Sequence, residues 1–199
     1  MGHAFAVHRP RREPGRPQVW LLHGVFTDHR LWARVWPGLD GLDVVALDGP
    51  GHGAADRLDP LPPLDDQVPL LAAVIEAHAD GPVVVAGHSW GGMLGVRLAA
   101  RRPELVSGLL LTNTPLLPGR GPGFPLQLAL LAAGFPLGAY GRRAAAALYG
   151  RAHLRAFPGA ADATAGTVRR LGRRGTRQLL RRVLIEPGDG ADLLGAVAA

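Results

Sequence analysis

The sequence predicts an α/β fold built on a mostly parallel sheet with flanking helices. Three observations predict it: short apolar runs recur up to residue 112, helical periodicity separates several of them, and glycine-rich turns follow them. Each strand–helix–strand step implies a parallel crossover. Strands are expected at 3–8, 18–23, 42–47, 82–87 and 106–112. Helices are expected near 29–36, 66–79 and 92–102.

A serine flanked by glycines follows the fourth predicted strand. The apolar run 82–86 leads into this turn, and a helix is expected to begin directly after it. G-x-S-x-G in a strand–turn–helix context is typical of a nucleophile elbow. The sharp turn strains the serine backbone and excludes side chains at the two glycines. It exposes the serine hydroxyl and places the next N–H at a helix N-terminus, where negative charge is stabilised. The turn consists of Gly87, His88, Ser89, Trp90 and Gly91.

Two further strands end in turns of defined composition. The apolar run 19–22 ends in His23 and Gly24, which are followed by Val25. The apolar run 44–47 ends in Asp-Gly-Pro-Gly-His-Gly. Three glycine-containing turns therefore follow three different predicted strands.

With these motifs in this order, residues 18–115 resemble the N-terminal two-thirds of an α/β-hydrolase core of the lid-bearing esterase and C–C hydrolase type. The resemblance implies a serine hydrolase in which Val25 and Trp90 donate the two oxyanion N–H groups. It also implies that the turn 48–53 shapes the floor beside the elbow. The motifs do not identify the substrate, and hydrolysis, C–C cleavage and perhydrolysis all remain open.

The rest of a catalytic triad is not evident. A serine needs a histidine base and a carboxylate that orients the histidine, and this fold supplies them in the order serine, acid, histidine. The only histidine after Ser89 is His153, and the only carboxylate between them is Glu104, at the end of a predicted helix. Asn113 follows the next strand, where some relatives carry the acid. We therefore expect the chain to be catalytically incomplete, with the last strands of the core missing.

The last residues allow two interpretations. A strand followed by a Gly-x-x-Asp turn would make Asp189 or Asp192 the acid. A Pro-Gly loop followed by a short helix over 191–199 is the favoured alternative, because the preceding stretch 176–184 has helical character. Neither interpretation leaves a histidine downstream.

The character of the chain changes after Pro115. A Pro-Gly-rich loop at 118–123 is followed by segments with helical periodicity. We expect residues 1–115 to form the core, 116–185 a helical lid inserted into the fold, and 186–199 the start of the return to the core. Lid helices are expected at about 124–133, 139–151, 162–172 and 176–185.

Positive charge is concentrated in the predicted lid. All 22 basic residues are arginines, and residues 116–182 hold 12 of them with only one acid, Asp162. A basic lid could recruit an acidic acyl carrier or substrate. The favoured alternative is that these arginines lie on solvated helix faces. Nucleic-acid binding is not expected, because no interleaved aromatic residues accompany the arginines.

Composition limits the remaining possibilities. Apolar residues make up 47% of the 199 residues, which predicts a globular chain. The chain has no cysteine, so disulfides and thiol catalysis are excluded. No long apolar segment suggests a signal peptide or a membrane span, so we expect a cytoplasmic protein that does not enter the membrane.

The histidines beside the motifs are expected to be structural. His23 and His52 lie in turns that should pack beside the elbow, and His88 should point away from Ser89. No pair of histidines has metal-ligand spacing with a carboxylate, so neither a metal nor another cofactor is expected.

Two functions are compatible with these residues. The first is a hydrolase in which Ser89 attacks an ester, thioester or related small apolar acyl substrate. The second is a non-catalytic protein of the same fold that binds a small apolar ligand, since a fold does not fix a function.

Overall fold

A five-stranded sheet forms the centre of the computed structural model, which describes residues 4–116, 123–182 and 190–198. The strand order is β1-β3-β2-β4-β5. β1 pairs antiparallel with β3, and the other three pairings are parallel. The strands are β1 (Ala6–Arg11), β2 (Gln18–Leu22), β3 (Asp43–Asp48), β4 (Val83–His88) and β5 (Val106–Thr112).

The apolar runs of the central strands bury side chains on both faces of the sheet, as expected for parallel strands covered on both sides. Alternate residues along a strand point to opposite faces. One face packs against helices in the larger core cluster and includes Trp20, Leu22, Val45, Leu47 and Val85. The other face packs against the segment that follows β2 and includes Val19, Leu21, Val44, Ala46 and Ala86.

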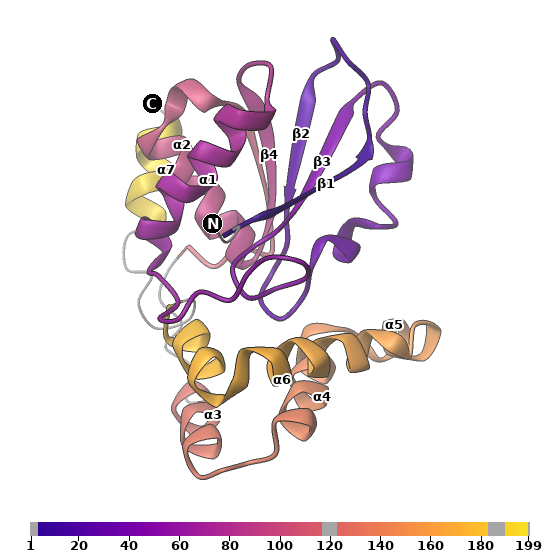
Figure 1. The fold of residues 1–199 in the computed structure, drawn as a ribbon, viewed down its shortest axis with the longest axis vertical. Helices are drawn as coiled ribbons and strands as arrows, with labels where there is room; N and C mark the ends of the chain where they lie inside the picture. The colour runs from indigo at the N-terminus through magenta and orange to yellow at the C-terminus, as the bar shows by residue number, and fades with distance from the viewer. Residues whose placement is uncertain (1–3, 117–122, 183–189, 199) are drawn as a thin grey trace.

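Helices α1 (Leu64–His78), α2 (Trp90–Arg101) and α7 (Gly190–Ala198) lie together on one side of the sheet (Figure 1). α2 contacts both α1 and α7. The opposite side is covered by two short 3-10 turns, η1 (His29–Trp32) and η2 (Trp36–Gly38). A third, η3 (Pro103–Leu105), leads into β5.

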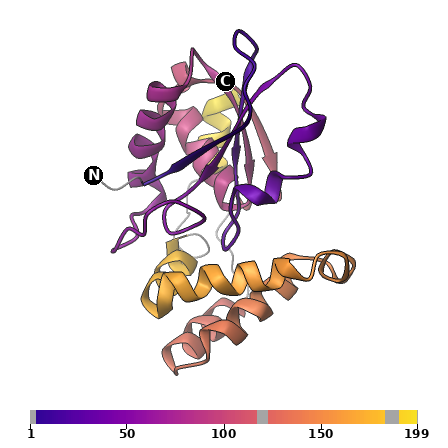
Figure 2. The same ribbon diagram turned by 45° about the vertical axis from the view of Figure 1, so that its right-hand side comes forward.

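Four more helices form a separate layer beneath the sheet. They are α3 (Gly123–Ala132), α4 (Leu137–Leu148), α5 (Arg151–Ala156) and α6 (Gly159–Leu180). In both ribbon views α6 lies between the sheet and helices α3 and α4 (Figures 1 and 2). Arg170 of α6 donates a 2.9 Å hydrogen bond to the carbonyl of Gly53, and Gln178 accepts one from the Leu61 N–H at 3.2 Å. The helical layer therefore contacts the loop that follows β3.

The predicted fold class is confirmed, and four of the five strands lie within one residue of their expected bounds. The bounds predicted for the first strand are wrong, because β1 begins and ends three residues later than expected. The segment 29–36, expected to be one helix, forms the two 3-10 turns instead. Its hydrogen bonds span three residues, from Ala33 to Arg30 and from Val35 to Trp32. Pro37 has no N–H with which to extend a helix.

The later helices also differ in detail from the expectation. The helices expected at 162–172 and 176–185 are joined in α6, which is kinked at Gly172, where φ is 68°. The expected helix at the end of the chain is confirmed as α7, and Asp192 lies exposed in its first turn. Most of the expected loop 118–123, together with Asp189, lies outside the described residues.

Candidate active site

Ser89 occupies a strained turn between β4 and α2. Its φ of 51° and ψ of −115° are unusual for a residue with a side chain. A Cβ on Gly87 would lie 2.4 Å from the Gly92 Cα, and one on Gly91 would lie 2.4 Å from the Leu22 carbonyl oxygen. Both contacts are with backbone atoms that cannot rotate away. The turn therefore requires glycine on either side of the serine.

Backbone hydrogen bonds hold this turn to the neighbouring strands. The Ser89 N–H donates to the Thr112 carbonyl at the end of β5, at 3.0 Å. The Gly91 N–H donates to the His23 carbonyl just after β2, at 3.1 Å. The ends of β2, β4 and β5 therefore meet at Ser89, which is the usual place for a site in an open parallel sheet.

The loop after β2 lies against the serine. A Cβ on Gly24 would lie 3.3 Å from the Ser89 Cβ and 2.8 Å from the His88 Cδ2. The Gly24 carbonyl accepts both the N–H and the hydroxyl of Thr27, at 3.3 and 2.8 Å. Val25, which follows Gly24, is buried in this tight loop. On the other side of Ser89, Trp90 begins α2, so its N–H has no acceptor within the helix.

Two buried histidines connect this loop to the turn after β3. His23 donates from Nδ1 to the Gly24 carbonyl at 2.7 Å and accepts the Gly49 N–H at Nε2, at 2.9 Å. His52 contacts the Pro50 carbonyl through Nδ1 at 2.9 Å and accepts the Phe26 N–H at Nε2, at 3.1 Å. Since a carbonyl can only accept, each ring carries its proton on Nδ1.

Both of these histidines are neutral. Burial lowers the pKa of His23, and burial together with the neighbouring His23 lowers the pKa of His52 to about 3. Because both nitrogens of each ring are hydrogen-bonded to the backbone, neither ring has a free lone pair to act as a base. Their function in this region is to position the two loops.

The Trp90 side chain fills the space between these loops. A Cβ on Gly49 would lie 2.2 Å from the Trp90 ring, so only glycine fits there. The His52 ring stacks on the Trp90 ring at 5.7 Å, and His23 lies 5.4 Å from it. The turn after β3 therefore forms the floor under the start of α2.

His88 lies next to Ser89 in the sequence but points toward β5. Its Nδ1 lies 3.2 Å from the hydroxyl oxygen of Thr112, which itself donates to the Gly87 carbonyl. Burial lowers the pKa of His88. This arrangement fits a neutral ring that supports the turn.

Residues 17–165 match the family described as the alpha/beta hydrolase fold. The chain belongs to the α/β-hydrolase fold family. It is 40% identical over 108 residues to "Lipase LipV" of Mycobacterium tuberculosis, a match that covers 54% of this chain and 41% of the lipase. It is 30% identical over 139 residues to a "Pimeloyl-[acyl-carrier protein] methyl ester esterase" of Neisseria meningitidis, covering 67% of this chain and 52% of the esterase.

Solved structures share the fold of this chain. A thermophilic esterase from Thermogutta terrifontis aligns with a TM-score of 0.78 at 20% identity, over 97% of this chain and 71% of the esterase. A hydrolase from Oleispira antarctica aligns with a TM-score of 0.79 at 15% identity, over 98% of this chain and 73% of that hydrolase. The matches to the curated relatives cover about half of those proteins or less.

In the part of the chain that the structure describes, no histidine hydrogen-bonds to the Ser89 hydroxyl. His153 packs instead between Tyr149, on which it stacks, and the tilted ring of Phe157, with ring centroids 4.9 Å apart in both cases. Glu104 is exposed and pairs with Arg102 at 2.5 Å, and this pairing lowers the pKa of its carboxyl.

His153 lines a cavity of about 290 Å³ between α5, α6 and the segment after β2. Apolar and aromatic side chains form part of its wall, and the guanidinium of Arg34 lies 5.1 Å from the centre of the Phe157 ring. Thr27, two residues beyond Val25, belongs to the same wall. This size is at the lower end for small-ligand cavities. None of the helices in the described residues is long and apolar enough to span a membrane.

Proposed function

We propose that this α/β hydrolase cleaves carboxylic esters, thioesters or related small acyl substrates with Ser89 as the nucleophile. The observation that carries the proposal is the strained backbone of Ser89 between β4 and α2, with Gly24 packed against it. Strain of this kind is kept where it serves a function. The names of the relatives, a lipase and several esterases, support ester cleavage.

The proposed reaction follows from the position of the turn. The Ser89 Oγ attacks the acyl carbon, and its proton passes to a histidine base, which then protonates the departing alcohol or thiol. The carbonyl oxygen becomes an oxyanion that accepts the N–H groups of Val25 and Trp90. Water then cleaves the acyl-enzyme bond by the same route, releasing the acid and restoring Ser89.

We infer that the base and its carboxylate belong to a segment outside these 199 residues. The family places both after the serine, in the order acid then histidine. Within the described residues, His153 is packed between two aromatic rings and Glu104 is paired at the surface. The matched relatives extend well beyond the shared region. β5 lies at the edge of the described sheet, so its outer edge can pair with a further strand.

Helices α3 to α6 are the proposed lid, and its basic face is the proposed docking site for an acidic acyl carrier. Exposed arginines recur along α6 and at its C-cap with helical spacing, and four of them surround a cavity of about 320 Å³. An acidic partner would be attracted to this surface. One group of relatives is named for an ester of acyl-carrier protein, which supports this partner. The four are Arg173, Arg174, Arg177 and Arg181.

The enzymatic proposal is tested by comparing the 199-residue chain with a version extended through the C-terminal part of its gene. Turnover of a short-chain p-nitrophenyl ester and covalent labelling by a fluorophosphonate are measured for both. The extended chain should be active and labelled, the short chain nearly inactive, and Ser89→Ala should abolish both signals. Ser107→Ala, an exposed serine on β5, is the matched control. Activity that survives Ser89→Ala would disprove the proposal.

A non-catalytic ligand-binding protein is the second candidate. It is favoured by one observation, the cavity of about 290 Å³ beside the loop that carries Val25. In that case the extended chain would bind a short-chain acyl amide, measured by calorimetry, yet would neither turn over the corresponding ester nor be labelled by the phosphonate.

A further inference from the structure

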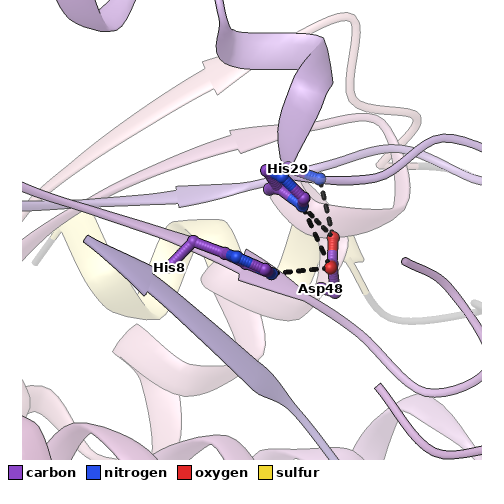
Figure 3. A group of neighbouring side chains, drawn as sticks. All are labelled: His8, His29 and Asp48. Carbon is purple, nitrogen blue, oxygen red and sulfur yellow. Dashed lines mark hydrogen bonds and ion pairs between the residues drawn. The ribbon is translucent and has the colours of Figure 1, made fainter. Parts of the chain in front are cut away.

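Two histidines and one aspartate lie in contact on the side of the sheet that carries η1 (Figure 3). The His8 Nε2 lies 2.7 Å from Asp48 Oδ2. The His29 Nδ1 lies 3.0 Å from each of the two carboxylate oxygens. The rings of His8 and His29 are stacked with their centroids 3.7 Å apart. The hydrolase mechanism proposed above does not use any of these three residues.

The sheet and one backbone hydrogen bond bring these residues together. In the antiparallel pairing of β1 with β3, His8 lies opposite Ala46. Since Asp48 is two residues beyond Ala46, its side chain projects from the same face as that of His8. His29 begins η1, and its own N–H donates to Asp48 Oδ1 at 2.7 Å.

Asp48 is a fixed and ionised anchor for the cluster. It is fully buried, and a Cβ on Gly53 would lie 1.9 Å from its Oδ2. Burial tends to raise its pKa, but the N–H groups of Ala54 and His29 outweigh that effect and bring the pKa of Asp48 down to about 2. Its oxygens still have lone pairs directed at the two imidazole rings.

We propose that His8, His29 and Asp48 bind one divalent transition-metal ion of the zinc class. The ligands are His8 Nε2, His29 Nδ1 and one carboxylate oxygen of Asp48, which all lie within 4.8 Å of one another. Two imidazoles and a carboxylate suit zinc and its neighbours better than magnesium or calcium, which prefer oxygen ligands. Side-chain exposures of 28% for His8 and 24% for His29 leave an approach for the ion and for a water as fourth ligand.

Binding requires a small rearrangement of the rings. In a tetrahedral site with ligands about 2.0–2.1 Å from zinc, neighbouring ligand atoms are roughly 3.3 Å apart. The present nitrogen–oxygen distances of 2.7 and 3.0 Å must therefore lengthen by a few tenths of an ångström. Because an imidazole binds a metal in its own plane, one of the stacked rings must also turn about its Cβ–Cγ bond. Their partial exposure leaves space for that turn.

The ion would connect three segments of the chain. These are the edge strand β1, the loop after β2 and the turn after β3. His29 lies four residues beyond Val25 on that loop. A bound ion would therefore stabilise the folded chain, by an amount that grows with its free concentration relative to its Kd. The proposal does not depend on Ser89 being catalytic.

Isothermal titration of the tag-free 199-residue chain with Zn²⁺ at pH 7.5 tests this site. We expect one ion per chain and a rise in melting temperature. His8→Gln and His29→Gln should each weaken binding by about tenfold or more. His78→Gln, an exposed histidine at the end of α1, is the matched control and should bind as the parent does. Circular dichroism verifies that each variant folds.

Cobalt provides a further measurement. Co²⁺ in place of Zn²⁺ should give the visible absorption of a four-coordinate site, and His8→Gln should remove it. Absence of stoichiometric binding, or equal binding by the parent, His8→Gln and His29→Gln, would overturn the proposal. The cluster would then be a hydrogen-bonded group only.

Discussion

The Phe26 N–H donates a 3.1 Å hydrogen bond to Nε2 of the buried His52. Phe26 has a φ of 59°, a left-handed conformation that a residue with a large side chain rarely adopts. The bond therefore fixes the loop after β2 in a conformation it would not adopt alone, directly after Val25. The ring of Phe26 also meets the Tyr140 ring of α4 edge-on at 6.4 Å, so the same residue contacts the helical layer. His52 is thus a positioning residue for the proposed oxyanion loop.

Acid should destabilise the fold through this histidine. The pKa of His52 is about 3 in the folded chain, below the ordinary value of 6.5. Between these values the unfolded chain binds more protons, so stability is full above about pH 6.5 and falls as the pH is lowered toward 3. The shift in the pKa of His23 acts in the same direction. Each factor of ten in proton affinity corresponds to about 1.4 kcal/mol.

Urea unfolding at pH 7.5 and at pH 5.0 measures this effect. The parent should lose stability at the lower pH. His52→Gln should be less stable at pH 7.5 but depend less on pH. His78→Gln, whose side chain is exposed, should keep the pH dependence of the parent. An unchanged dependence in His52→Gln would contradict the assignment of a buried neutral ring.

Gly91→Ala should destabilise the protein strongly. The added Cβ would lie 2.4 Å from the Leu22 carbonyl oxygen, and the backbone on both sides would have to move apart. Overpacking of this kind typically costs about 1–3 kcal/mol. The matched control is Gly81→Ala, because a Cβ there meets nothing within 4 Å. Equal unfolding free energies for the two variants, from urea denaturation, would rule out the tight turn.

Much of the fold was predictable because its signals are local. Apolar runs and glycine turns identified the strands, and the spacing of Gly87 and Gly91 identified the strained serine. The cluster of His8, His29 and Asp48 was not predictable in this way. His29 and His8 are 19 and 40 residues from Asp48 along the chain, and they meet it through the His29 N–H bond and the β1–β3 register. A search for short ligand spacings therefore does not detect it.

The segment 29–36 was mispredicted for a similar reason. Its residues have helical spacing, but the His29 N–H bonds to Asp48, a partner outside the segment. Local periodicity describes the apolar face correctly, since Trp32 is buried against the sheet. It does not predict the hydrogen bonds inside the segment, which span three residues, from Ala33 to Arg30 and from Val35 to Trp32.

Ser89→Gly should stabilise the protein while removing the nucleophile. Glycine adopts a φ of 51° without the steric cost that a side chain brings. Relief of backbone strain is worth about 1–3 kcal/mol, and the greater freedom of glycine in the unfolded chain offsets up to about 1 kcal/mol of it. Ser89→Ala retains the strain and serves as the control. Urea denaturation should therefore rank Ser89→Gly as the more stable of the two, and the reverse order would show that the turn is not strained.

Charge reversal on α6 should weaken binding of an acidic acyl carrier, if the helical layer is its docking site. Arg177 and Arg181 are exposed and line the cavity of about 320 Å³. Arg173 is less suitable for substitution, because it holds the carbonyls of Gly134 and Phe135 at the turn before α4. The double variant Arg177→Glu with Arg181→Glu should lower the affinity for an acyl-carrier protein by about tenfold or more, mostly through slower association.

The control changes the charge of the helical layer by the same amount elsewhere. Arg151→Glu with Arg155→Glu alters two exposed arginines of α5, outside that cavity. Surface plasmon resonance at 50 and 300 mM salt should give a parent affinity that falls with salt, since exposed charges more than about 10 Å apart are screened at 0.1 M. The α6 variant should depend less on salt than the parent, and the α5 variant should behave as the parent does. Equal losses in both variants would mean that net charge attracts the carrier, whereas no loss in either would remove α6 as its docking site.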